Sequence, residues 1–347
     1  MIQIPFLEKR ILGIDLGSIN TKIVEVVRKK DSFEIVNFGI IPIINFKESA
    51  SYIYILEEQI GKMISEFISV SKVKAKEAVL NIPAPYVFSV NITVPNIPEK
   101  SLPQIIRFES QRQIPLGLEE IELDYRYVNF ETETQFRQWL VYLVATPKNY
   151  LEKIKTILDI AKIKFGGYYP EYLAFETYFK NRAGVQAVID IGHSYSVLSL
   201  IKDGKVIFGN RLKIRGYDWL DSVMRLTNYS EEEVLNFVYK KGFYFDPEEK
   251  ELKELADNFL NITAEIISRE LERIENSFLL RIDKVYWTGG LSILPGFKEK
   301  IASRLFKYQQ EVLLPTGLFR GDKFMGLKER GTIFSQALGV AFQKLMS

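Results

Sequence analysis

Residues 11–22 read ILGIDLGSINTK, and the expected fold follows from them. An apolar run ends at Asp15, and the strand-like run KIVEVV begins seven residues later, at Lys22. Between them lie small residues typical of turns: Gly17, Ser18, Asn20 and Thr21. The pattern predicts a β-hairpin whose turn N–H groups suit an anion such as phosphate. An ordinary hairpin, with Asp15 and Ser18 as turn formers, explains this stretch alone equally well.

The pattern occurs a second time at residues 187–200, AVIDIGHSYSVLSL. This repeat favours the anion-binding hairpin over the ordinary one. An apolar strand again ends in an aspartate, Asp190, and a glycine again follows two positions later. The turn consists of Gly192, His193, Ser194, Tyr195 and Ser196. An internal duplication of this kind predicts two similar lobes facing one nucleotide. His193, the chain's single histidine, has no neighbouring nucleophile, so we interpret it as a turn residue that touches the nucleotide.

A third motif follows at residues 285–297, VYWTGGLSILPGF. An apolar strand ends in Gly289 and Gly290, and Leu291 follows. Paired glycines leave a flat surface without Cβ atoms, against which an adenine ring or a ribose can lie. The motif is weak alone, but its order after the two aspartate hairpins is specific.

Together the three motifs resemble the actin-like ATPase superfamily. The resemblance implies an α/β, actin-like (ribonuclease H-like) fold of two lobes that bind ATP and Mg²⁺ in the cleft between them. Asp15 and Asp190 would then hold the Mg²⁺ through water and are the only candidates for a catalytic role, so we expect at most weak ATPase activity. Lys22 either neutralises a phosphate or points to solvent. The other residues expected at the nucleotide are Gly17, Ser18, Asn20, Thr21, Gly192, His193, Ser194, Tyr195, Ser196, Gly216, Glu233, Gly289, Gly290 and Leu291.

Composition limits the class of protein. A chain of 347 residues, 47% hydrophobic and 26% charged, is long and apolar enough for two globular lobes. The absence of cysteine excludes disulfides and thiolate metal sites, and a net charge of +2 argues against bulk nucleic-acid binding. No apolar run of about 18 residues and no signal-peptide pattern occurs, which predicts a cytoplasmic protein.

Between the first hairpins and residue 165, a small α+β unit is predicted over residues 87–164. It comprises a helix at 101–113, strands at 122–130 and 138–145, and a helix at 147–163. An insertion at this place is similar to those of the FtsA and PilM families. Its stretch IIRFESQRQIPLGLEEIELDYRYV resembles the PilM family of type IV pilus assembly proteins in particular. The matching positions are Glu109, Ile114, Pro115, Glu119, Glu120, Asp124 and Tyr125.

The rest of the chain divides around this unit. Residues 1–86 and 165–183 are expected to form the first lobe, and residues 184–216 and 282–347 the second. Residues 217–281 are expected to form a helical part over the cleft, with a capped helix start at Ser230. The final helix, residues 332–346, carries an apolar stripe that we expect to pack on the second lobe's sheet. A membrane-binding amphipathic helix is the alternative.

Two features depart from the PilM pattern. Gly216 precedes Tyr217 where the family tends to have paired glycines. Glu233 and Lys240 stand at shifted spacing, where acidic and lysine residues of the family reach the ribose. The resemblance nevertheless implies an ATP-binding scaffold at the inner face of the cytoplasmic membrane. Its partner would be a PilN-like membrane protein, whose cytoplasmic N-terminal peptide lies in a groove between the first lobe and the inserted unit. Self-association is left open. The basic residues Arg107, Arg112 and Arg126 either contact an acidic partner or form a solvated face. An FtsA-like division protein and a small-molecule kinase are the alternatives.

Overall fold

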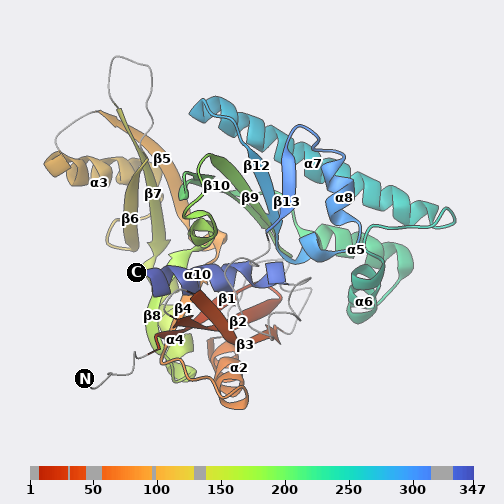
Figure 1. The fold of residues 1–347 in the computed structure, drawn as a ribbon, viewed down its shortest axis with the longest axis horizontal. Helices are drawn as coiled ribbons and strands as arrows, with labels where there is room; N and C mark the ends of the chain where they lie inside the picture. The colour runs from red at the N-terminus through yellow and green to blue at the C-terminus, as the bar shows by residue number, and fades with distance from the viewer. Residues whose placement is uncertain (1–7, 30–31, 44–56, 96–98, 129–137, 314–330) are drawn as a thin grey trace.

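The computed structural model describes residues 8–29, 32–43, 57–95, 99–128, 138–313 and 331–347. Within these ranges, two five-stranded sheets share one topology (Figure 1). In each sheet, three consecutive strands form an antiparallel meander, and two later strands add in parallel beside the first of them. The duplicated hairpin predicted two similar lobes, and that prediction is confirmed.

The first sheet has the strand order β3-β2-β1-β4-β8. Its strands are β1 (Arg10–Leu16), β2 (Asn20–Lys29), β3 (Ser32–Pro42), β4 (Glu77–Ile82) and β8 (Lys164–Pro170). The register of the β1–β2 hairpin places Asp15 directly opposite Lys22, so both side chains lie at the turn end of the sheet.

Helices α2 (Glu57–Val70) and α4 (Lys148–Ile160) pack against each other below this sheet (Figure 1). Their buried side chains, such as Ile60 and Ile154, share a hydrophobic core with Leu12 and Ile14 of β1. Residues 147–163 were predicted as part of the inserted unit, whereas in the structure the apolar side of α4 packs on α2.

The final helix, α10 (Ser335–Met346), follows the short 3₁₀ helix η7 (Gly331–Phe334) and lies on the first sheet. Ala337 and Leu338 form a hydrophobic cluster with Ile11 and Val24, on the face of that sheet opposite α2 and α4. The prediction that this helix packs on the second lobe's sheet was wrong. An apolar stripe fits any apolar sheet face, so helical periodicity alone does not identify the sheet.

Gly13 allows the close approach of α10 to β1. A Cβ atom at Gly13 would lie 2.1 Å from the backbone oxygen of Ala337. Replacing Gly13 with alanine is expected to lower the free energy of unfolding by about 1–3 kcal/mol, because helix and strand must separate. Chemical denaturation measures this change. Gly290→Ala is the control, since a Cβ atom there meets nothing within 4 Å; a Gly13→Ala protein as stable as its parent would contradict the packing.

The inserted unit is a three-stranded sheet of order β5-β7-β6 with one helix on it. Its elements are η1 (Ala84–Tyr86), β5 (Phe88–Pro95), η2 (Glu99–Ser101), α3 (Leu102–Gln113), β6 (Ile121–Val128) and β7 (Gln138–Pro147). Leu102 and Ile106 of α3 pack against Ile92 and Val141, which gives the unit a core of its own. The loop expected between β6 and β7 lies outside the described residues.

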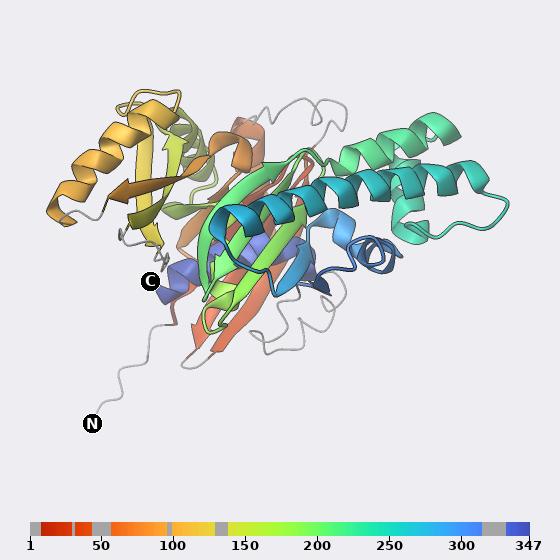
Figure 2. The same ribbon diagram turned by 90° about the horizontal axis from the view of Figure 1, so that it is seen from above.

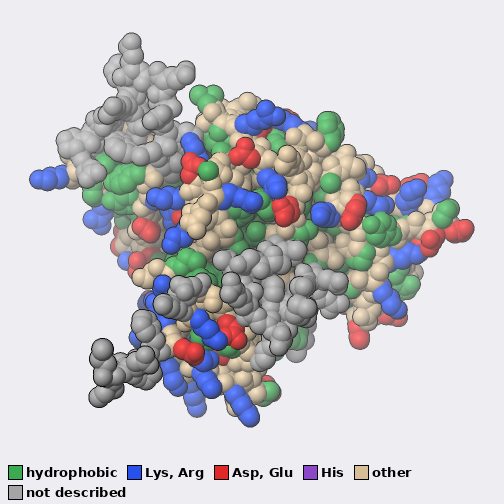
Figure 3. Space-filling view, in the orientation of Figure 1, with side chains coloured by type: hydrophobic (Ala, Val, Ile, Leu, Met, Phe, Trp, Pro, Cys, Tyr) green, Lys and Arg blue, Asp and Glu red, His purple; other side chains and the backbone are tan. Residues whose placement is uncertain are grey.

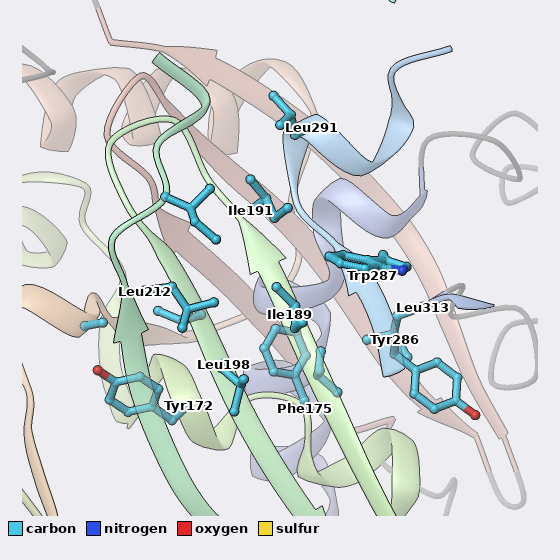
Figure 4. Close-up of a cluster of buried hydrophobic side chains, with 14 of the residues drawn as sticks. Tyr172, Phe175, Ile189, Ile191, Leu198, Leu212, Tyr286, Trp287, Leu291 and Leu313 are labelled. Atoms are coloured by element: carbon cyan, nitrogen blue, oxygen red, sulfur yellow. The ribbon is translucent and has the colours of Figure 1, made fainter. Parts of the chain in front are cut away.

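The second sheet has the order β11-β10-β9-β12-β13. Its strands are β9 (Val185–Ile191), β10 (Ser196–Lys202), β11 (Lys205–Leu212), β12 (Lys284–Thr288) and β13 (Gln309–Val312). Figure 4 shows Ile189 of β9, Leu198 of β10 and Trp287 of β12 in the buried cluster of this lobe. The short helices η5 (Gly290–Ile293) and α8 (Phe297–Ala302) follow β12.

Three helices lie between β11 and β12: α5 (Gly216–Thr227), α6 (Glu231–Lys241) and α7 (Lys250–Phe278). The long α7 runs across the second sheet (Figure 2), where Asn210 of β11 donates a 2.7 Å hydrogen bond to Glu270. Helix α6 begins with the predicted capping box. Its N-cap, Ser230, accepts a bond from the backbone of Glu233 and donates its own N–H to the Glu233 carboxylate at 2.8 Å.

Basic and acidic side chains are interspersed over much of the face shown in Figure 3. Within the described ranges, no helix is both long and apolar enough to cross a bilayer.

Candidate functional site

A cavity lies where the two aspartate hairpins and the glycine pair meet. Its volume, counted together with the open space at its mouth, is about 1060 Å³. Most of the predicted site residues line it: Asp15, Gly17, Ser18, Asn20, Lys22, Asp190, Gly192, His193, Ser194, Tyr195, Gly216, Gly289, Gly290 and Leu291. Clefts of this kind, lined by apolar side chains with a few charged groups, are typical ligand sites.

The two hairpin turns are built alike. A Cβ atom on Gly17 would lie 2.7 Å from the backbone oxygen of Asn20, and one on Gly192 would lie 2.6 Å from that of Tyr195. In both turns a backbone oxygen occupies the place that a Cβ atom of the glycine would take. The position two residues after the aspartate therefore requires glycine. The internal duplication thus extends to the shape of the turns.

Three predicted residues do not line the cavity. Thr21 is buried beside the first turn, and Ser196 donates its hydroxyl to the backbone oxygen of Ile214 at 2.9 Å. Glu233, expected near the nucleotide, is exposed and caps α6. Its placement at the cavity was wrong, because its carboxylate is bound to the backbone and hydroxyl of Ser230.

Asp15 is held at the centre of the site by its neighbours. Lys22 Nζ donates to Asp15 Oδ2 at 2.9 Å, and Asn81 Nδ2 donates to Oδ1 at 2.6 Å. Asn81 in turn accepts a bond from the backbone N–H of Leu16 at 3.1 Å. The aspartate is nearly buried, so these bonds replace the water it has lost.

Asp190 lies across the cavity on the second hairpin. Gln336 of α10 donates its side-chain N–H to Asp190 Oδ2 at 3.1 Å. Burial raises the pKa of Asp190 to about 6, and the charge of Asp15 adds to this shift. The final helix therefore connects the second aspartate to the first lobe's sheet.

Glu171 is a third carboxyl group at the cavity, directly after β8. Its Oε2 accepts bonds from the backbone N–H of Ala84 at 2.8 Å and the hydroxyl of Tyr195 at 3.0 Å. Burial raises its pKa to about 8, with further contributions from Asp190 and Asp15. At neutral pH this glutamate is therefore largely protonated in the folded protein.

Lys22 is the cation of this group. Burial alone would lower its pKa, but the charge of Asp15 and the hydrogen bond to it raise the pKa above its ordinary value, assisted by Asp190 and Glu171. The sequence left open whether Lys22 faces a phosphate or solvent. The structure places it in the cavity, with a side chain only 20% exposed.

The second turn also receives the start of α5. The backbone N–H groups of Gly216 and Tyr217 donate to the carbonyls of Gly192 and His193, each at 2.9 Å. The ring of Tyr217 stands edge-on to that of His193, 5.4 Å between centroids, and Tyr217 does not line the cavity. Burial lowers the pKa of His193 to about 4, so the imidazole is neutral at physiological pH.

Sequence reasoning missed Glu171, Asn81 and Gln336. The first two follow from the topology, because β1, β4 and β8 are parallel and their carboxyl ends meet at one edge of the sheet. Asp15 and Asn81 lie at the ends of two of these strands, and Glu171 follows the third. After β8 the chain forms two short 3₁₀ helices, η3 (Glu171–Leu173) and η4 (Glu176–Phe179).

Several solved structures share this fold. A chain from the PilM-PilN type IV pilus biogenesis complex matches with a TM-score of 0.81 at 20% identity, over 96% of this chain and 98% of that chain. The ethanolamine utilization protein EutJ from Carboxydothermus hydrogenoformans matches with a TM-score of 0.58 at 14% identity, over 97% and 90% of the two chains. MreB5 of Spiroplasma citri bound to ADP matches with a TM-score of 0.55 at 9% identity, over 97% of each. The predicted two-lobe actin-like fold is confirmed.

The family is shown by a match along almost the whole sequence. The family model described as type IV pilus assembly protein PilM matches residues 13–344. This range includes both lobes, the inserted unit and the helices over the second sheet. The chain belongs to the PilM family of type IV pilus assembly proteins.

Proposed function

We propose that the protein is an ATP-binding scaffold of the type IV pilus inner-membrane assembly complex. The observation that carries the proposal is the meeting of two aspartate hairpins and a glycine pair at one cavity, in a chain of the PilM family. The protein would lie in the cytoplasm, at the inner face of the membrane, and attach there through its partner. The family match favours neither an FtsA-like division protein nor a small-molecule kinase.

The donor set at the cavity fits a nucleotide bound with Mg²⁺. The turns offer backbone N–H groups and Lys22 to phosphate, while Asp15 and Asp190 repel it. A divalent cation is therefore needed between the aspartates and the phosphates, and it would neutralise phosphate charge there. Among the described residues, no cluster of three or more acidic, histidine or cysteine side chains could hold a metal ion directly.

Buried polar atoms at the site support the same fit. Asn20 Oδ1, Thr21 Oγ1 and Gln336 Oε1 are buried and have no hydrogen-bond partner among the described residues. Asn20 lies in the first turn, and Gln336 is bound to Asp190. Buried polar groups are rarely left unpaired, so ordered water or a ligand is expected near them.

The proposed partner is the cytoplasmic N-terminal peptide of a PilN-like membrane protein. The structural relative with the TM-score of 0.81 was solved as a PilM-PilN complex. The inserted unit adds a sheet whose outer strand β6 has no further strand beside it among the described residues. An open sheet edge of this kind suits an extended peptide, which gains affinity from main-chain hydrogen bonds without any catalysis.

The inserted unit also contacts the second lobe, which provides a route from the cavity to the proposed peptide site. Asn91 Nδ2 and Ser89 Oγ on β5 donate to the backbone oxygens of Ile207 and Gly209 on the edge strand β11, at 2.9 Å and 3.0 Å. Movement of the second lobe on nucleotide binding would thus be transmitted to β5. Arg126, considered above as a partner contact, pairs instead with Glu176 at 2.6 Å.

Calorimetry of ATP binding, with and without Mg²⁺, tests the proposal. We expect Mg²⁺ to tighten ATP binding to the unmodified protein, and Asp15→Asn with Asp190→Asn to abolish that tightening, because the carboxylates that hold the hydrated ion are gone. A synthetic peptide from the N-terminus of the PilN-like partner should bind both proteins. Mg²⁺-dependent ATP binding that persists in the double variant would overturn the assigned metal position. Failure of the unmodified protein to bind ATP would remove nucleotide from the function.

A further inference from the structure

The cavity has a charged end and an apolar end. The charged end contains Asp15, Asp190, Glu171 and Lys22, and the lysine interacts with all three carboxyl groups. Phosphates are expected here, between the two hairpin turns. The nucleoside must then extend toward the opposite end, past the glycine pair.

The opposite end is lined by apolar side chains from three separate elements. Leu220 comes from α5, Leu235 and Val238 from α6, and Leu291 and Leu294 from the segment after β12. Tyr239 of α6 also lines the cavity, and its side chain is 49% exposed. Beyond the two hairpin turns, Glu171 is the only charged or amide side chain in the described lining, and it belongs to the charged end.

Two charged side chains of α6, Glu233 and Lys241, are held by local bonds, while Lys240 is exposed and does not line the cavity. The Glu233 carboxylate binds the backbone and hydroxyl of Ser230. Lys241 forms ion pairs with Asp246 at 2.8 Å and with Glu249 at 2.7 Å. The helix therefore presents leucine, valine and tyrosine to the cavity.

We propose that the protein grips a nucleotide by its phosphates and that the side chains described at the other end of the cavity hold the nucleoside mainly by apolar contact, so that the protein does not distinguish ribose from deoxyribose or adenine from guanine. A site discriminates strongly against an analogue when its own buried polar groups are left unpaired by that analogue. The described lining of the apolar end presents no side chain of this kind to a ribose hydroxyl. This inference rests on the proposed nucleotide binding and specifies which nucleotides are accepted.

A panel of four ligands tests the inference on the full chain. ATP, 2′-deoxy-ATP, GTP and inorganic tripolyphosphate are titrated calorimetrically in the presence of Mg²⁺. The three nucleotides are expected to bind within about threefold of one another, because no hydrogen bond is lost among them. Tripolyphosphate should bind at least about tenfold more weakly, because it lacks the apolar contact.

A pair of leucine variants locates the apolar contact. Leu235→Ala removes a half-buried side chain at the cavity, and it should weaken all three nucleotides by a similar factor, roughly five- to tenfold, without changing tripolyphosphate binding. Leu226→Ala is the matched control, since Leu226 lies on α5 outside the cavity lining and is 37% exposed. It should leave all four affinities unchanged.

The outcomes separate this inference from the proposed function. If ATP binds tightly but 2′-deoxy-ATP or GTP binds at least about tenfold more weakly, the inference is overturned. The proposed binding of ATP would then still stand. A loss of that size would mean that a polar group of the site is left unpaired by the analogue. An equal effect of Leu235→Ala on tripolyphosphate and the nucleotides would also overturn it. Failure of all four ligands to bind would overturn the proposed nucleotide binding itself.

Discussion

Replacing Glu171 with glutamine is expected to stabilise the protein at about pH 8 by on the order of 4 kcal/mol. The pKa of Glu171 rises from 4.5 to about 8 on folding, chiefly because the carboxyl group is buried and secondarily because Asp190 and Asp15 are near. The folded state therefore binds a proton that the unfolded state has released. Stability falls as the pH rises through this window, and glutamine removes the loss because it carries no proton to release.

Denaturant unfolding from about pH 5 to about pH 8 measures the effect as a change of slope. Glutamine keeps an oxygen that can accept the bonds from Ala84 and Tyr195, so the fold should persist. Glu152→Gln, on the exposed side of α4, controls for the change of net charge. Asp190, whose pKa rises from 3.8 to about 6 through burial and Asp15, contributes a slope of the same sign at lower pH. A Glu171→Gln protein with the parent's slope would show that Glu171 is ionised when folded.

The two lobes could be predicted because their signal is local and repeated. Each hairpin needs an apolar strand, an aspartate at its end and a glycine two residues later, and the oxygens of Asn20 and Tyr195 explain that glycine. Turn chemistry of this kind depends on neighbours in sequence. Most of the cavity lining was predictable for the same reason.

The errors concern contacts between distant segments. The apolar stripes of α4 and α10 predicted buried helices, but which sheet each would cover depended on residues such as Gly13, which admits the backbone of Ala337. Glu171 and Gln336 reach the site only through the parallel strand order and the path of α10. Glu233 was misplaced because a glutamate three residues after Ser230 can either cap the helix or contact a ligand. In the structure it caps the helix through its bonds to Ser230.

Lys22→Met is expected to lower the free energy of unfolding by about 3–5 kcal/mol, because it leaves the buried Asp15 carboxylate without its cation. Lys22 Nζ lies 2.9 Å from Asp15 Oδ2, and the side chain of Asp15 is 7% exposed. If Lys22 contacts phosphate as proposed, the same change should weaken ATP binding by roughly a hundredfold, since a charge-assisted contact in a partly buried site is lost. Denaturation and calorimetry measure the two effects separately.

The double variant Lys22→Met with Asp15→Asn separates folding from binding. Asparagine keeps an acceptor for Asn81 and removes the unpaired charge, so most of the lost stability should return. Binding should not return, because neither the phosphate cation nor the carboxylate that holds hydrated Mg²⁺ is restored. Recovery of both would mean that Lys22 acts on the nucleotide only through Asp15. Recovery of neither would mean that Lys22 stabilises the lobes through Asp190 and Glu171, the other two carboxyl groups with which it interacts.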